Sequence, residues 1–437
     1  MIRSLLMLGV VAALMASARS FMPVGDAGEA GVALGFGFVL IAAMQTGEIF
    51  AAMRLPRLTG YLVCGMLFGP AVTGLLTPSM VSGLRLVNGV AVGLIALTAG
   101  SELNFKQLRP RLRSVTLISA VALPATLLST MVVLALINPP FFVGLSTGQR
   151  WMAACSIGVL FASLSPAIVL AMLSENAAAG PVSEVALGVV VLADIVIIVL
   201  FAVVHALAAG MFVTAGADVG HQMSPVVQLS IEIFGSMGIG VLVGLAIAAW
   251  YRFVRGHMAL FILAVCVVSA EVGTRLHLDP LIINLTAGLL LENFLGLRGA
   301  IIARLLEPAA LPIFAVFFAL AGAKLSLVDL RAMWALALGF ALLRAGALVS
   351  GGRLGAHLAG AEPRVKHWMP LVLVPQAGVS VGLAELLARH FPSWGVGANV
   401  LVMGVVTINQ FLGPVLLRLA LVKSDEVGKR APGDTGH

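Results

Sequence analysis

Charge is what this sequence has least of. Asp, Glu, Lys and Arg make up 10% of its 437 residues, whereas soluble domains carry about 25%. Hydrophobic residues reach 60%. This balance excludes a soluble globular domain and predicts an all-α polytopic membrane protein. The formal net charge of +7 is therefore assigned to loops beside a bilayer, and no nucleic-acid partner is expected.

Cysteine is scarce as well, and the motifs of several enzyme classes are missing. Cys64, Cys155 and Cys266 are the only three cysteines. They lie in separate apolar runs without metal-ligand spacing, so we interpret them as packing residues. The glycine-rich GSMGIGVLVG (235–244) lies inside an apolar run and not after a strand, which argues against a nucleotide loop. No Ser, His and acid pattern pairs a nucleophile with a base, so we expect neither an enzyme nor a cofactor.

Long apolar segments are what the chain has most of. We expect a transmembrane domain over 26–421 with about 13 helices, most of them long enough to cross about 30 Å of hydrocarbon. The predicted segments are 30–52, 58–76, 84–101, 114–138, 151–173, 183–208, 226–250, 257–276, 281–296, 308–324, 332–355, 368–388 and 396–421.

The two ends of the chain are interpreted separately. Residues 1–20 combine a basic start, a short apolar core and the small residues ASA at 16–18, which is typical of a signal peptide. The alternative is an extra N-terminal helix. The polar tail, 422–437, is expected to be disordered and cytoplasmic. With the mature N-terminus outside, the predicted inner loops hold most of the 26 Lys and Arg residues, which supports N-outside, C-inside and an odd helix count.

Two segments carry residues that interrupt helices. VLFASLSPAIVLAML places Ser163, Ser165 and Pro166 in the middle of segment five, and LVPQAGVSVGLAELL places Pro375, Gln376 and Gly378 in the middle of segment twelve. Proline removes an intrahelical hydrogen bond, and the freed backbone groups must be satisfied inside the membrane. Because the segments are seven apart, they run in opposite directions. Paired interruptions of this kind predict an inverted repeat with two crossed discontinuous helices and a midplane site.

A single acid, Asp194, interrupts the apolar run VVVLADIVIIVLF at 189–201. A carboxylate at mid-membrane costs about 2.5–3.5 kcal/mol on insertion scales, and no basic residue lies within one helical turn. One interpretation is a structural pairing with another helix. The other, which we favour, is a proton and monovalent cation site where the two ions compete for one carboxylate.

Two basic residues within or beside apolar segments are further candidates. Arg344 lies in segment eleven, and either compensates the partial charges of the broken helices or couples directly to the ion. Lys324 ends segment ten, and either extends its amine to the membrane surface or lines an outer cavity.

Several stretches together resemble the monovalent cation:proton antiporters, above all the branch with potassium-efflux antiporters. They occur in the family's order and span nearly the whole membrane part: LPRLTGYLVCGMLFGP, GLIALTAGSELNFKQLR, SLSPAIVLAML, LADIVIIVLF, LIINLTAGLLLENF, PIFAVFFALAGAKL and VPQAGVSVGLAELL. The resemblance implies a 13-helix homodimer with elevator-like alternating access in a bacterial inner membrane. It also implies core helices at about 114–208 and 332–421, dimerisation helices at about 30–101 and 257–324, and a linker helix at 226–250.

The resemblance assigns ion binding to Asp194, with Ser163 and Ser165 in the unwound stretch beside it. Two departures stand out. Ala193 occupies a position where relatives carry Asp, Asn or Gln, and none of the stretches corresponds to the family's nucleotide-binding regulatory domain. With one carboxylate we expect electroneutral exchange of one Na⁺ or K⁺ for one H⁺. The alternative is an uncoupled cation channel or sensor on the same fold.

Overall fold

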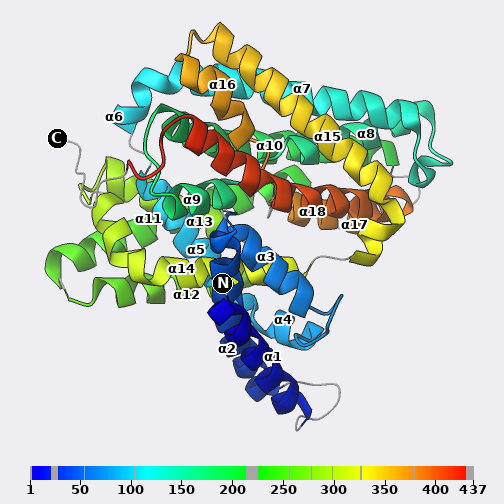
Figure 1. The fold of residues 1–437 in the computed structure, drawn as a ribbon. Helices are drawn as coiled ribbons and strands as arrows, with labels where there is room; N and C mark the ends of the chain where they lie inside the picture. The colour runs from blue at the N-terminus through cyan, green and yellow to red at the C-terminus, as the bar shows by residue number, and fades with distance from the viewer. Residues whose placement is uncertain are drawn as a thin grey trace.

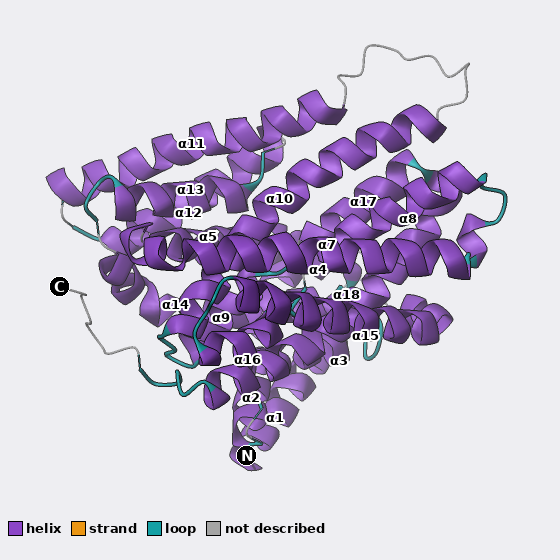
Figure 2. Ribbon diagram, turned by 90° about the horizontal axis from the view of Figure 1, so that it is seen from above, coloured by secondary structure: helices purple, strands orange, loops and turns teal. Residues whose placement is uncertain are grey.

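The computed structural model is helical throughout the part of the chain that it describes, and Figure 2 shows helices joined by loops without a strand in that part. The described residues are 2–20, 28–53, 55–102, 105–212, 225–254, 256–276, 278–297, 299–324, 327–376 and 379–429. The first half of the chain forms α1 (Ile2–Ser20), α2 (Gly28–Ala52), α3 (Arg57–Phe68), α4 (Pro78–Gly83), α5 (Arg85–Glu102), α6 (Phe105–Leu108), α7 (Leu112–Ile137), α8 (Thr147–Ala162), α9 (Pro166–Glu175) and α10 (Pro181–Phe212).

The second half continues with eight further helices. These are α11 (Pro225–Phe253), α12 (Met258–Leu276), α13 (Pro280–Asn293), α14 (Gly299–Ala323), α15 (Leu327–Leu358), α16 (Pro363–Val372), α17 (Val379–His390) and α18 (Pro392–Lys423). Short 3₁₀ turns occupy Arg109–Arg111 and Pro140–Phe142. The all-α expectation is confirmed for the described residues.

Eight spans in the described residues are long and apolar enough to cross a membrane, counting α8 and α9 as one. Four shorter apolar helices accompany them, so the number 13 stays a prediction. One boundary is wrong: the expected segment 58–76 ends as α3 at Phe68, and α4 follows separately. A loop joins α3 to α4. It ends at Thr77, which starts α4 as its N-cap: the Thr77 hydroxyl accepts a hydrogen bond from the Met80 amide.

The helices gather into two packing groups that are mixed in sequence. In one group α7 packs against α8 and α15, and α18 packs against α15 and α17; Figure 1 shows α7 in cyan beside α15 in yellow. In the other group α5 packs against α12, α13 and α14, while α3 packs against α2 and α14. Helices far apart in the chain therefore build each group.

Close helix crossings hold the second group together. A Cβ added at Gly65 of α3 would lie 1.8 Å from the Ala319 carbonyl oxygen of α14, and one at Gly322 would lie 2.1 Å from the Leu62 carbonyl oxygen. Only glycine permits such an approach of two backbones, as is typical of helix contacts in membranes.

The first and the last described segments, 2–20 and 424–429, contact this framework. Helix α1 packs against α2, and Arg19 donates a hydrogen bond to the Gly74 carbonyl. A helix over 2–20 is compatible with a leader and with an extra helix, so both interpretations stay open. The expectation of a disordered tail is wrong for residues 424–429: Ser424 and Glu426 are buried against the preceding helices, because a carboxylate in this stretch finds backbone donors.

Candidate functional site

The first interruption separates α8 from α9. Ser163, Leu164 and Ser165 leave the helix, and α9 begins at Pro166. Ser165 is extended (φ −124°, ψ 97°), and its hydroxyl accepts a hydrogen bond from the Ile168 amide at 3.3 Å. Serine before proline is a strong helix start, because the hydroxyl caps a free amide and proline has none to satisfy. Local chemistry thus opens the helix here.

The second interruption separates α16 from α17. Pro375 and Gln376 lie in the non-helical stretch after α16, and α17 begins at Val379. Gly378, which the sequence also predicts to interrupt this segment, lies outside the described residues.

Arg344 joins the two interruptions. Its side chain is fully buried in α15, and its three nitrogens donate to three carbonyls: Phe161 at 2.7 Å, Ser163 at 2.7 Å and Val374 at 2.6 Å. These carbonyls end α8 and follow α16, where half-helix dipoles are negative. The planar guanidinium fork therefore donates to carbonyls of both interruptions at once.

A second set of polar contacts binds the interruptions to each other. The Gln376 amide nitrogen donates to the Leu160 carbonyl and to the Ser380 hydroxyl, each at 3.0 Å, and its oxygen accepts from Asn409 at 2.9 Å. The Ser163 hydroxyl donates to the Leu160 carbonyl at 2.8 Å and shares a hydrogen bond with Ser380. Ser163 thus belongs to the network that joins the two interruptions.

Asp194 lies near the middle of α10, which packs against α8, α9 and α16. The residue is 5% exposed, and among the described residues its Oδ1 has no hydrogen-bond partner. The next residues, Ile195 and Val196, are 57% and 40% exposed. Asp194 therefore sits at the margin of the packed face. A buried carboxylate oxygen without a donor is costly unless a proton or a cation neutralises it.

Sequence reasoning missed a second acid, Asp279, which precedes α13. Its carboxylate accepts a hydrogen bond from the Leu281 amide at 2.7 Å and caps that helix. It lies close enough to Asp194 for the two like charges to interact. The signal available was an Asp-Pro pair before an apolar run, which marks a helix start but says nothing of tertiary neighbours.

The remaining candidates lie elsewhere. Lys324 follows the last residue of α14 and is exposed. Within the described residues no three His, Cys, Asp or Glu side chains could hold a metal ion together. All three cysteines are free thiols.

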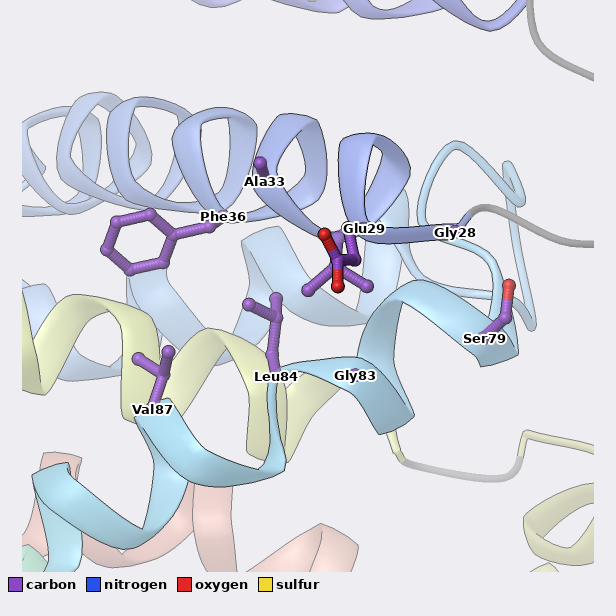
Figure 3. Close-up of a pocket in the computed structure, with 9 residues that line it drawn as sticks. Gly28, Glu29, Ala33, Phe36, Ser79, Gly83, Leu84 and Val87 are labelled. Carbon is purple, nitrogen blue, oxygen red and sulfur yellow. The ribbon is translucent and has the colours of Figure 1, made fainter. Parts of the chain in front are cut away.

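An open cavity of about 550 Å³ lies between the start of α2 and the α4–α5 region (Figure 3). Apolar side chains, among them Phe36, Leu84 and Val87, form most of its wall, and Glu29 and Ser79 supply polar atoms. None of the site candidates above lines it, so we assign it no part in ion binding.

Comparison with known proteins identifies the family. Residues 30–423 match the model of the transmembrane sodium/hydrogen exchanger family. The ammonium/H⁺ antiporter subunit AmhT of Alkalihalophilus pseudofirmus is 24% identical over 59% of this chain and 62% of its own length. The Na⁺/H⁺ antiporter NhaS5 of Synechocystis is 25% identical over 60% of this chain and 35% of its own. The chain thus aligns with less than two thirds of each relative.

The fold also has a solved counterpart. The sodium proton antiporter MjNhaP1 of Methanocaldococcus jannaschii, in its structure at pH 8, superposes with a TM-score of 0.64 at 16% identity, over 91% of this chain and 99% of that one. A separate electron-microscopy structure of the same protein gives 0.66 at 15% identity. At this identity the likeness concerns the fold alone.

Proposed function

Because the chain belongs to the transmembrane sodium/hydrogen exchanger family, we propose that it is a secondary antiporter exchanging a monovalent cation, Na⁺ or K⁺, for H⁺ at Asp194. One observation carries the proposal: a buried carboxylate with an unpartnered oxygen lies on a helix packed against the first interruption. The names of the relatives, which are antiporters of Na⁺ or NH₄⁺ with H⁺, agree with this class of transport.

Competition at Asp194 is the proposed mechanism. Either a proton or a cation neutralises the carboxylate, so the loaded site moves through an apolar barrier, whereas the bare charge is held back by its desolvation cost. Ser163 and Ser165 would add oxygen ligands from the unwound stretch. Arg344 donates to carbonyls of both interruptions, and Asp279 caps α13, so we assign the charge that balances the ion to Asp194.

The proposed architecture is a 13-helix inverted repeat that works by alternating access. The triplets α7, α8–α9, α10 and α15, α16–α17, α18 would be its halves and form a moving core. The helices α2–α5 and α12–α14 would form the dimerisation part of a homodimer, with α11 as the linker. We place it in a bacterial inner membrane, N-terminus outside and C-terminus in the cytoplasm. The two packing groups of the fold support this division.

The proposal is tested in proteoliposomes that trap a pH-sensitive dye. Adding Na⁺ or K⁺ outside an acid-loaded vesicle is expected to move protons, with Li⁺ and NH₄⁺ run in parallel to define the ion. Because Ala193 puts no second carboxylate next to Asp194 in the sequence, we assign one carboxylate to the ion, and the initial rate is expected to stay the same when valinomycin and a K⁺ gradient impose a membrane potential on Na⁺-driven exchange. A rate that follows the imposed potential would contradict one-for-one exchange.

The channel or sensor alternative also rests on Ala193, which is fully buried and offers no second polar group. Reversal potentials separate the two functions. A channel conducts the cation along its own gradient without proton flux, whereas an exchanger with one-for-one coupling carries no net current.

A contact between the proposed core and dimerisation parts yields a further prediction. The Glu175 carboxylate at the end of α9 accepts a hydrogen bond from the Arg57 amide at the start of α3, at 2.7 Å. If the core moves, this contact opens in every cycle. We expect the Arg57 and Leu58 amides to exchange hydrogen faster during cation-driven turnover than at rest.

Glu175→Gln is expected to raise that exchange about tenfold without turnover, since it removes a charge-assisted hydrogen bond of about 1.5–3 kcal/mol. Glu48→Gln is the matched control, because Glu48 pairs with the partly exposed side chain of the same Arg57 at 3.0 Å and does not contact its amide. Exchange that is equal at rest and during turnover would place α3 and α9 in one rigid body.

A further inference from the structure

The residues after α18 turn back onto the connection between α9 and α10. Ser424 is fully buried and Glu426 is 1% exposed, although both follow the last residue of the final helix. Between them Asp425 adopts a left-handed conformation (φ 60°). This places Glu426 under the first turn of the helix that carries Asp194.

Both oxygens of the Glu426 carboxylate are used. Oε1 accepts from the Val182 amide at 2.7 Å, and Oε2 accepts from the Ser183 amide at 2.8 Å and from the Ser183 hydroxyl at 2.6 Å. The amides of a first helical turn have no partner within the helix and form the positive end of its dipole. Glu426 thus supplies, from 243 residues away, an anionic cap for α10.

Backbone contacts extend this cap to α9. The Ala179 amide donates to the Glu426 carbonyl at 3.2 Å, and the Gly428 amide donates to the carbonyl of Asn176, which ends α9, at 3.0 Å. Gly180 has φ +150°, and a Cβ there would lie 2.6 Å from the Glu426 carboxyl carbon. Residues 424–428, here called the strap, therefore fit closely into the α9–α10 connection.

The strap joins the two elements that form the proposed ion site. Helix α9 begins at the Ser163–Ser165 interruption, and Asp194 follows Val182 by 12 positions along α10, about 18 Å at 1.5 Å per residue. A straight helix transmits a displacement of its first turn over that distance. The separation between Asp194 and the interruption therefore depends on how the cytoplasmic ends of α9 and α10 are held together.

We propose that Glu426 is a positioning residue for ion exchange: by clamping the start of α10 to the end of α9, it keeps Asp194 in register with the interrupted helix. The inference rests on the proposed function of Asp194.

Transport kinetics of the full-length protein test the clamp. Glu426→Gln places an amide NH₂ against backbone donors and removes the charge, and we expect the apparent KM for Na⁺ to rise about tenfold, equivalent to about 1.4 kcal/mol. Ser183→Ala removes one of three hydrogen bonds, and a rise of about threefold is expected. Asp425→Asn is the matched control: Asp425 is exposed and pairs with Lys429 at 2.6 Å, and asparagine tolerates its left-handed backbone.

Amide hydrogen exchange over residues 176–185 provides a second measurement. In Glu426→Gln the amides of Val182 and Ser183 are expected to lose protection while those of α7 keep theirs. A role in general stability only would lower the maximal rate in proportion to folded protein and leave KM unchanged, and that result would overturn the proposal. Should Glu426→Gln fail to fold, Ser183→Ala provides the test: a threefold rise of the KM supports the clamp, and an unchanged KM overturns it.

The outcome separates the clamp from the function on which it rests. If Asp194→Asn still exchanges ions, the proposed function fails, whatever Glu426 does. If Asp194→Asn is inactive and Glu426→Gln keeps a normal KM and normal protection of α10, the function stands and the clamp is wrong.

Discussion

Asp194→Asn is expected to reduce cation-driven proton movement to the level of protein-free liposomes. Asparagine has nearly the same volume as aspartate but neither ionises nor binds a proton in this range, so it removes the competition between ions and keeps the packing. Because Oδ1 has no hydrogen-bond partner in the described structure, no contact of that oxygen is lost. Unfolding temperature and yield are therefore expected to stay at the wild-type values.

The proposed competition at Asp194 also predicts a pH dependence in the wild type. Protons occupy Asp194 more fully as the pH falls, so the apparent KM for the cation is expected to rise toward acid pH and to level off once the carboxylate is ionised. The maximal rate at saturating cation changes less, since cation displaces the proton. If the KM for the cation stays constant across pH, the proton and the cation bind at different sites and do not compete at Asp194.

Asp279→Asn is the matched control for the charge change. Asparagine caps a helix about as well as aspartate, so α13 should keep its start at Pro280, and exchange should persist. Loss of exchange in Asp279→Asn together with retention in Asp194→Asn would move the ion site to the loop before α13 and end the assignment made here.

Arg344→Met is expected to prevent stable folding. The substitution leaves three buried carbonyls without donors, and each such group costs about 1–3 kcal/mol. Together these penalties are comparable with the whole stability of a protein domain, about 5–15 kcal/mol. Thermal unfolding in detergent and the monodisperse yield measure the loss.

Two further variants serve as controls for this result: Arg344→Lys keeps the charge at the same site, and Arg353→Met removes a charge elsewhere on the same helix. Lysine keeps the charge but its compact ammonium lacks the planar fork that reaches both interruptions, so an intermediate stability is expected. Arg353 lies on the same helix with an exposed side chain, and its replacement by Met should leave the unfolding temperature within about 2 °C, as for most surface substitutions. Equal unfolding temperatures for Arg344→Met and Arg353→Met would show that the contacts of Arg344 with the two interruptions do not stabilise the fold.

Local chemistry explains which features the sequence could predict. The interruption before Pro166 follows from serine and proline acting within one helical turn, and the isolated Asp194 is visible against its apolar neighbours. The end of α3 at Phe68 was missed because Gly69 to Leu76 read as apolar, while their turns depend on backbone hydrogen bonds such as that from the Leu76 amide to the Phe68 carbonyl.

Long-range partners explain what it could not. The sequence leaves two roles open for Arg344, because the carbonyls that it contacts lie 181 and 183 positions earlier and 30 positions later in the chain. Glu426 looked like part of a solvated tail, since its donors belong to α10. No local pattern distinguishes a glutamate that reaches such donors from one that meets only water.

The contacts of Arg344 also constrain the order of biosynthesis. During synthesis Phe161 and Ser163 enter the membrane long before Arg344, and Val374 enters after it. Two of the three acceptors are thus in the membrane when the arginine leaves the translocon. Their hydrogen bonds lower the free-energy cost of placing its charge in the hydrocarbon region. The end of α8 would then act as a template on which α15 is retained, and a chain truncated between residues 358 and 374 should already hold α15 in the membrane.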